Sequence, residues 1–227
     1  MKALISWSSG KDSAWALHVV RSAWALHDVR GAGELEVVGL LTTVNERVDR
    51  VAMHGVRREL LARQAAALGL PLHVIELPEP CSNAIYERRM AAFVDSARAA
   101  GIERVVFGDL FLEDIRAYRE RQLAGTGIEP VFPLWGRPTA QLARDMLDAG
   151  VVATLTCVDS RKLAPSFAGR RWDAALLDAL PEGVDPCGEH GEFHSFVSAG
   201  PGMARIEVRV GEIVDRDGFV FADLEVG

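Results

Sequence analysis

Short apolar runs alternate with longer segments of helical periodicity over the first hundred residues. Four runs rich in Val, Ile and Leu predict buried strands: 2–7, 37–44, 71–78 and 104–110. The clearest helical segment is 52–68, where Gly69 and Pro71 end the apolar spacing. Further helices are expected from Ser82, as N-cap, to about 100, and over 114–123. Strands that alternate with helices are typical of parallel βαβ units, and continuous apolar strands fit a sheet covered on both faces.

The elements predicted for the rest of the chain differ from this alternation. They are a helix over 139–149, a strand over 151–158, a helix ending at Pro181, and two terminal strands joined by the hairpin signal Asp217-Gly218. We place a boundary at the Gly-Thr-Gly run 125–127, so that the second part begins with EPVFPLW. The expected fold is therefore an α/β domain with a parallel sheet over 1–125 and a smaller α+β domain over 126–227.

The hexapeptide SAWALH occurs twice, at 13–18 and 22–27. Nine residues turn an α-helix by about 900°, so the two copies face opposite directions. We expect Trp15 to pack inward against the sheet, with Leu17 on the opposite side and Trp24 exposed or in an interface. The second copy is most simply a duplication that lengthens the first helix by up to about 13 Å.

Composition narrows the class of protein. The 227 residues are 49% hydrophobic and 25% charged, which is typical of a folded globular protein. The net charge of -7 argues against binding that rests on neutralising many phosphates of a nucleic acid. Three cysteines without CxxC spacing predict no disulfide framework, and no apolar run approaches the ~18 residues of a membrane helix. The cytoplasm is the expected compartment.

The stretch SSGKDS, Ser8 to Ser13, follows the first predicted strand directly. A strand that delivers these residues to a helix start brings backbone N–H groups, hydroxyls and the positive end of the helix dipole together, which favours an anion. Gly10 permits close approach of phosphate, Lys11 supplies charge, and Asp12 orients Mg²⁺ or caps the helix. Lys11 gains weight because Lys and Arg together number 25 and only three are lysines. The stretch does not match GxxxxGK[ST], and the plain alternative is a helix cap.

SSGKDS resembles the SGGxDS signature of the PP-loop ATP pyrophosphatases. Ser9 stands at the signature's first glycine, and a serine is expected to be tolerated there if its φ is negative. Further blocks are similar to the bacterial branch of the diphthine–ammonia ligase family: TTVNE (42–46), MHGVRRELL (53–61), CSN (81–83), FGDLFLEDIRAYRE (107–120), FPLWGR (132–137), CVD (157–159), SFAGR (166–170) and GVDPCGEHGEFHSF (183–196). In the last block His190 and Ser195 replace the relatives' Asn and Thr.

The resemblance implies a HUP-type, Rossmann-like domain that uses ATP and Mg²⁺. The residues expected to bind the nucleotide are Ser8, Ser9, Gly10, Lys11 and Ser13 for the pyrophosphate, Leu41, Thr42 and Thr43 for the adenine, and Arg57, with His54 as weaker support, for the α-phosphate or acyl group. Asp109 ends the fourth strand at the same sheet edge and is expected to contact Mg²⁺ or substrate, together with Asp12. The plain alternative for Asp109 is a helix cap.

The Gly-rich run 183–196 is expected to bring Glu189, Glu192 and His194 together. These side chains would bind Mg²⁺, hold ammonium or remove a proton from the incoming amine. A zinc site of Cys187, His190 and His194 is one alternative, and a polar surface loop is another. A second loop, with Lys162, Ser166 and Arg170, suits an acidic substrate or is simply solvated. The catalytic residues that we expect are therefore Lys11, Asp12, Asp109, Glu189, Glu192 and His194.

The function that these residues favour is an AMP-forming ligase or amidase. It would adenylate a substrate carboxylate with release of pyrophosphate and pass the acyl group to ammonia or another amine. In archaeal and eukaryotic relatives the substrate is diphthine on elongation factor 2, whereas the acceptor of this chain is open. Two alternatives stay open: a non-catalytic adenine-nucleotide sensor and a PP-loop enzyme that modifies RNA. We expect no membrane or nucleic-acid partner, and a homodimer is an open alternative.

Overall fold

The first sheet of this computed structural model is parallel except for one short strand. The structure describes residues 1–26, 35–51 and 54–227. The strands of this sheet are β1 (Lys2–Ser6), β2 (Glu36–Asn45), β3 (Arg50–Val51), β4 (Leu72–Leu77), β5 (Ile102–Val106) and β6 (Glu129–Val131). β1 lies between β2 and β5, β4 pairs with β2, and β6 pairs with β5. The chain therefore passes from β1 to β2 on one side of β1 and later adds β5 on the other side of β1. Ligands of such sheets bind at the point where the strand order reverses in this way.

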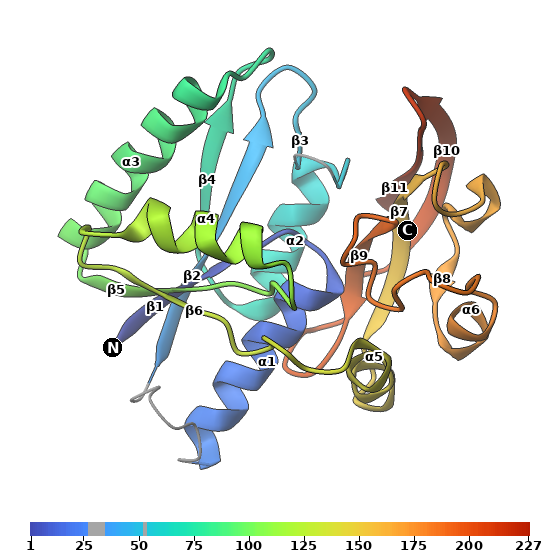
Figure 1. Ribbon diagram of the computed structural model, residues 1–227, viewed down its shortest axis with the longest axis horizontal. Coiled ribbons are helices and arrows are strands. Elements are labelled where there is room, and N and C mark those ends of the chain that lie inside the picture. The colour runs from blue at the N-terminus through green and yellow to red at the C-terminus, as the bar shows by residue number, and fades with distance from the viewer. Residues whose placement is uncertain (27–34, 52–53) are drawn as a thin grey trace.

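Helices cover both faces of this sheet (Figure 1). They are α1 (Lys11–Leu26) and α2 (Arg58–Leu68) on one face, and α3 (Asn83–Ala99) and α4 (Glu113–Leu123) on the other. Ser82 caps α3 by accepting a hydrogen bond from Ile85 N, and Gly69 ends α2 in the left-handed conformation, as predicted. The α/β prediction for this part is confirmed.

The predicted start of α2 at residue 52 is wrong. Arg50 and Val51 pair with the end of β2 as β3, and Gly55 has a φ of 66°. Both features interrupt a helix, so α2 begins six residues later. His54 and Arg57 therefore lie in the connection before the helix, where Arg57 has an extended backbone.

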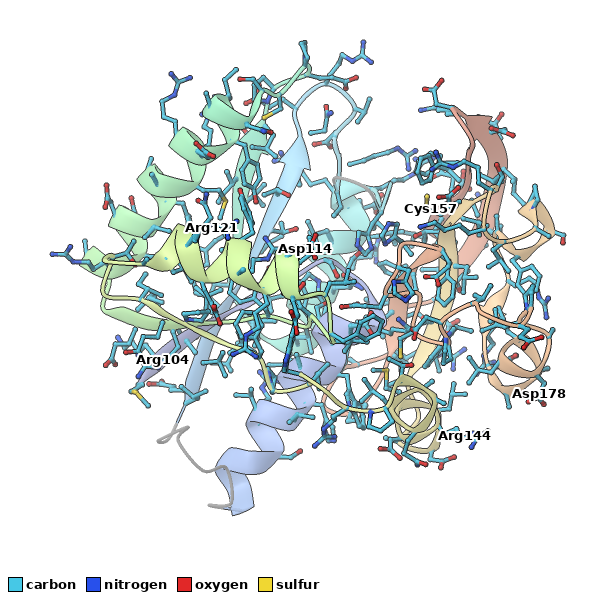
Figure 2. The ribbon with its side chains drawn as sticks, in the orientation of Figure 1. Arg104, Asp114, Arg121, Arg144, Cys157 and Asp178 are labelled. Atoms are coloured by element: carbon cyan, nitrogen blue, oxygen red, sulfur yellow. The ribbon has the colours of Figure 1, made fainter. Side chains whose placement is uncertain are left out.

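The second sheet is antiparallel throughout its described pairs. Its strands are β7 (Val152–Asp159), β8 (Arg171–Trp172), β9 (Phe193–Ala199), β10 (Val208–Arg216) and β11 (Phe219–Val226), with α5 (Thr139–Asp148), the 3-10 helix η1 (Pro165–Phe167) and α6 (Ala174–Asp178) around it. Asp217 and Gly218 both have positive φ, as their hairpin turn requires. Cys157 lies on β7 (Figure 2), and all three cysteines are free.

One hydrophobic core joins the two parts of the chain. It includes residues of α1, α2 and the second sheet. Trp15 is buried as predicted, but Leu17 is buried too, because α1 lies between the first sheet and β9 and has no fully solvated side there. The side chain of Trp24 lies outside the described residues. We expected the first domain to end at residue 125. β6 follows this boundary in the chain but still pairs with β5 of the first sheet.

No helix in the described part of the chain is long and apolar enough to cross a membrane.

Candidate active site

A cavity of about 670 Å³ lies at the carboxyl ends of β1, β2 and β5. This volume is in the range of small-molecule sites. Its polar wall comes from both parts of the chain: Ser8, Gly10, Lys11, Asp12, Ser13, Thr43, His54, Asp109, Glu189, His194 and Ser195. Apolar side chains of α3, α4 and the sheet line the rest. The cavity is therefore polar at the sheet edge and apolar beneath α3 and α4.

The loop after β1 gathers hydroxyls at the start of α1. Ser8 Oγ lies 3.3 Å from Ser13 Oγ and accepts a hydrogen bond from Gly10 N, and Ser13 Oγ donates to the Gly10 carbonyl at 2.9 Å. A Cβ at position 10 would lie 3.2 Å from the Ser195 carbonyl oxygen. A residue without a side chain thus lets β9 approach the loop closely, and the helix start faces the cavity.

Ser9 adopts a φ of 70°, so the condition of a negative φ, under which we expected a serine to be tolerated, is not met. Its carbonyl accepts hydrogen bonds from Val197 N at 2.9 Å and Gln64 Nε2 at 3.0 Å, and these contacts fix the backbone. The side chain is buried, does not line the cavity, and its Oγ has no hydrogen-bond partner among the described residues. The backbone of Ser9 is therefore strained, but its side chain does not occupy the cavity.

Gln64 holds this loop against the second sheet. Its Oε1 accepts from Trp7 Nε1 at 2.8 Å, and its Nε2 also donates to the Val197 carbonyl at 2.7 Å. We did not predict this role from sequence. The signal in the sequence is a glutamine on an otherwise apolar helical stripe, and the structure shows that Gln64 is fully buried.

Lys11 is buried and charged. Its Nζ donates to both oxygens of Asp12, at 2.8 and 3.0 Å, and to the Cys187 carbonyl. Burial alone would lower the pKa of Lys11, but the negative charges of Asp12 and its neighbours raise it. The ammonium also lies 5.5 Å from the centre of the Trp172 ring and 5.6 Å from that of Phe193. It thus links the loop to the second part of the chain.

Asp109 lies just beyond β5, opposite the loop. Burial raises its pKa, and the Asp12 carboxylate adds to this while Arg119 opposes it. Asp109 Oδ2 is buried, has no hydrogen-bond partner among the described residues, and lies 3.7 Å from Arg119 Nε. A Cβ on the preceding Gly108 would lie 2.9 Å from the Asp12 carbonyl carbon, so only glycine allows this approach. Gly108 and Arg119 were both missed by sequence reasoning.

Glu189 and His194 line the cavity, whereas Glu192 does not. Glu189 Oε1 accepts a hydrogen bond from Leu110 N at 2.7 Å, and burial raises its pKa to about 7. His194 packs on His54 with ring centres 4.5 Å apart, and burial lowers its pKa to about 4. Glu192 Oε1 instead accepts from Asp185 N at 3.0 Å, which shapes the loop. The structure therefore places Glu189 and His194, but not Glu192, at the cavity.

Two family models match nearly the whole chain. The one described as diphthamide synthase N-terminal domain matches residues 1–130, and the one described as diphthamide synthase C-terminal domain matches residues 138–223. The chain belongs to the diphthamide synthase family. Among individually curated proteins, none matches the chain. Membership in this family, that of the diphthine–ammonia ligases, confirms the resemblance predicted from the sequence blocks and supports an ATP-dependent ligase activity in broad terms.

The other expected residues of this diphthamide synthase family member fall into two groups. Leu41, Thr42, Thr43 and His54 line the cavity, and His54 Nδ1 lies 3.5 Å from the Ser195 carbonyl oxygen. Arg57 lies outside the cavity, where its guanidinium binds both oxygens of Asp223 on β11.

The loop of Lys162, Ser166 and Arg170 does not line the cavity. Lys162 Nζ donates to the His190 carbonyl, and the Arg170 guanidinium lies over the Phe167 ring.

The three residues of the zinc alternative have different neighbours. Cys187 Sγ lies 3.6 Å from the Thr139 carbonyl oxygen, His190 packs on Phe111, and His194 packs on His54. Within the described ranges, no three His, Cys, Asp or Glu side chains gather closely enough to hold a metal ion.

The donors present fit Mg²⁺ bound together with a nucleotide. Mg²⁺ takes one or two protein carboxylates and completes its shell with phosphate oxygens and water. Asp109 supplies a buried oxygen without a hydrogen-bond partner among the described residues, and Asp12 lies near enough to influence its pKa. Asp12 and Asp109 would be the residues that hold the ion.

Proposed function

We propose that the chain is an AMP-forming ligase that activates a carboxylic acid with ATP and transfers its acyl group to ammonia or another amine. A carboxylate oxygen attacks the α-phosphorus, and the bond from this phosphorus to the bridging oxygen breaks, releasing pyrophosphate. The amine nitrogen then attacks the acyl carbon, AMP leaves, and the nitrogen loses a proton. The observation that carries the proposal is that the hydroxyl-rich loop, Asp109 and Glu189 face one cavity.

The first part of the chain would bind ATP. The pyrophosphate would lie at Ser8, Gly10 and Ser13, where hydroxyls and backbone N–H groups at a helix start stabilise negative charge. Lys11 adds a fixed positive charge behind the loop. Leu41, Thr42 and Thr43 would contact adenine at the end of β2. Mg²⁺, when bound, neutralises charge on the phosphate oxygens.

The second part of the chain would complete the site for the acyl transfer. Glu189 is suited to accept the proton of the amine, because its pKa of about 7 places it near neutral pH. Burial keeps the imidazoles of His54 and His194 neutral, so they add no positive charge that would repel ammonium. Glu192 would position Glu189 through the loop at Asp185.

Product analysis with matched lysine variants tests this proposal. The full chain is incubated with radiolabelled ATP, Mg²⁺, ammonium and a pool of carboxylic acids, and AMP and pyrophosphate are quantified. We expect both in equal amounts and a loss of at least about 100-fold in Lys11→Met, the scale seen when one charge-stabilising group is removed. Lys2→Met, at an exposed lysine on β1 outside the cavity, should retain activity.

Three outcomes would contradict the ligase. Formation of ADP would indicate cleavage at the other phosphate bond. Tight ATP binding without AMP would favour a nucleotide-binding module. AMP formation that depends on tRNA, with binding that falls steeply with salt, would favour an enzyme that modifies RNA.

A further inference from the structure

A second, smaller cavity adjoins the candidate active site between α3 and α4. It has a volume of about 110 Å³. Six of its lining residues also line the larger cavity: Tyr86, Met90, Val94, Phe107, Arg119 and Leu123. The two cavities therefore adjoin along these side chains, between the sheet edge and the gap between the helices. We refer to this segment, defined by these six residues, as the α3–α4 passage.

The passage exists because α3 packs loosely on the sheet. Of its 17 residues, only Val94 and Ala97 are buried. The larger apolar side chains on the same helix, Met90 and Phe93, are only partly buried and line the cavity instead. A partly exposed apolar lining of this kind favours a ligand with an apolar body.

Arg119 is the cationic side chain that lines both cavities. It reaches in from α4, the helix that carries Asp114 and Arg121 in Figure 2. Its guanidinium lies 5.1 Å from the centre of the Phe107 ring. Its Nε is buried and makes no hydrogen bond to the described residues, and Asp109 Oδ2, at 3.7 Å, is beyond hydrogen-bond distance. The Asp109 carboxylate thus gives Arg119 an ion pair but not a hydrogen bond, so the buried N–H is left to an acceptor from outside the protein.

A second arginine on α4, Arg116, has a hydrogen-bond partner and lies away from both cavities. Arg116 Nε donates to Glu120 at 2.8 Å, and its guanidinium lies over the rings of Phe132 and Trp135. Arg116 lines neither cavity. Arg119 thus differs from Arg116 in that its Nε–H makes no hydrogen bond to the described residues and in that it lines both cavities.

We propose that the α3–α4 passage binds the acid substrate, with its carboxylate on Arg119 and an aliphatic or aromatic body among the apolar side chains. The inference rests on the proposed ligase function and names its substrate class. Guanidinium and carboxylate match in geometry and charge. A carboxylate on Arg119 lies beside Asp109, at the edge where the phosphate loop faces the cavity. Adenine carries no anionic group for Arg119, and it would meet Leu41, Thr42 and Thr43 near the end of β2.

Calorimetry with simple probes tests this assignment on the full chain. Octanoate is titrated with α,β-methylene-ATP present, and octylamine serves as the probe of opposite charge. We expect octanoate to bind and octylamine not to bind. Arg119→Met should weaken octanoate binding about tenfold or more, as for loss of a charged hydrogen-bond donor, while nucleotide affinity changes less than twofold. Arg116→Met should alter neither.

A second variant tests the body of the ligand. Met90→Trp narrows the passage and should weaken octanoate more than it weakens acetate, and its thermal melt reports whether it folds. Failure of octanoate to bind the wild type would overturn the proposal. Arg119→Met that weakens the nucleotide alone would assign Arg119 to a phosphate, and Met90→Trp that weakens the nucleotide alone would assign the passage to adenine.

AMP formation tests the proposed ligase function separately from the substrate site. If no acid supports AMP formation, the function is wrong even where octanoate binds. If AMP forms equally well in Arg119→Met, the function stands and the substrate site is wrong.

Discussion

The two faces of the first sheet are packed very differently. On one face, α2 buries five of its eleven residues, and α1 lies between this sheet and β9. On the other face, α3 buries two of seventeen residues and α4 one of eleven. The first face is closed by protein, whereas the second encloses the cavity. Burial on the closed face fixes the phosphate loop, and incomplete burial on the open face leaves room for ligands.

This difference follows from what covers each pair of helices. The second sheet adds a layer over α1 and α2, so that apolar residues on two sides of a helix become buried. Figure 1 shows α3 and α4 at the other face, away from the second sheet. A ligand in the cavity would supply part of the missing contact. The stability of the open face should therefore depend on ligand, and that of the closed face should not.

Truncation of one apolar side chain on each face gives the largest expected contrast. Leu61 is fully buried on α2, so Leu61→Ala should lower the free energy of unfolding by about 3 kcal/mol, through lost burial and the resulting void. Met90 on α3 is partly exposed to the cavity, so Met90→Ala should cost less than about 1 kcal/mol. Urea denaturation of both variants measures this difference. Equal losses would show that the open face is packed as tightly as the closed one.

The pH dependence of stability tests the mouth of the open face. The pKa of Glu189 is raised to about 7 by burial, so between about pH 4.5 and 7 the folded chain binds more protons than the unfolded chain. The free energy of unfolding should therefore fall as pH rises through this window, by up to about 3 kcal/mol from this group. Glu189→Gln lacks the titration, so its stability relative to wild type should increase over the same window.

The control for this prediction is Glu182→Gln, an exposed glutamate in the same segment of the chain. Its stability relative to wild type should not change with pH between 4.5 and 7. A pH-independent difference between Glu189→Gln and wild type would mean that Glu189 is ionised in the fold throughout the window. It would then not be the proton acceptor that we propose.

Local patterns predicted the scaffold well because the forces behind them act between near neighbours. Gly69, Ser82 and the Asp217-Gly218 turn each satisfy a requirement of their own few residues, and each was placed correctly. The early start predicted for α2 failed because β3 is a two-residue pairing with β2, which leaves almost no periodicity in the sequence.

The candidate site was harder to predict because partners far along the chain decide where side chains point. Arg57 is held outside the cavity by Asp223, 166 residues later. Arg119 was overlooked because the nearby i,i+4 ion pair of Arg116 and Glu120 is typical of a solvated helix face. The family signature placed the phosphate loop, but Gln64 and β9 fix its backbone.

Replacement of Ser9 by glycine should give a smaller effect, in the opposite direction. A φ of 70° costs a residue with a Cβ about 1–2 kcal/mol, and the buried hydroxyl lacks a hydrogen-bond partner among the described residues. Ser9→Gly removes both penalties but gives the unfolded chain more freedom, so we expect a net gain of about 1 kcal/mol in urea denaturation. Ser9→Ala removes only the hydroxyl and should gain less. If Ser9→Gly destabilises the protein, the left-handed backbone of residue 9 does not strain the fold. The phosphate loop on the closed face would then be less rigid than the hydrogen bonds to the Ser9 carbonyl indicate.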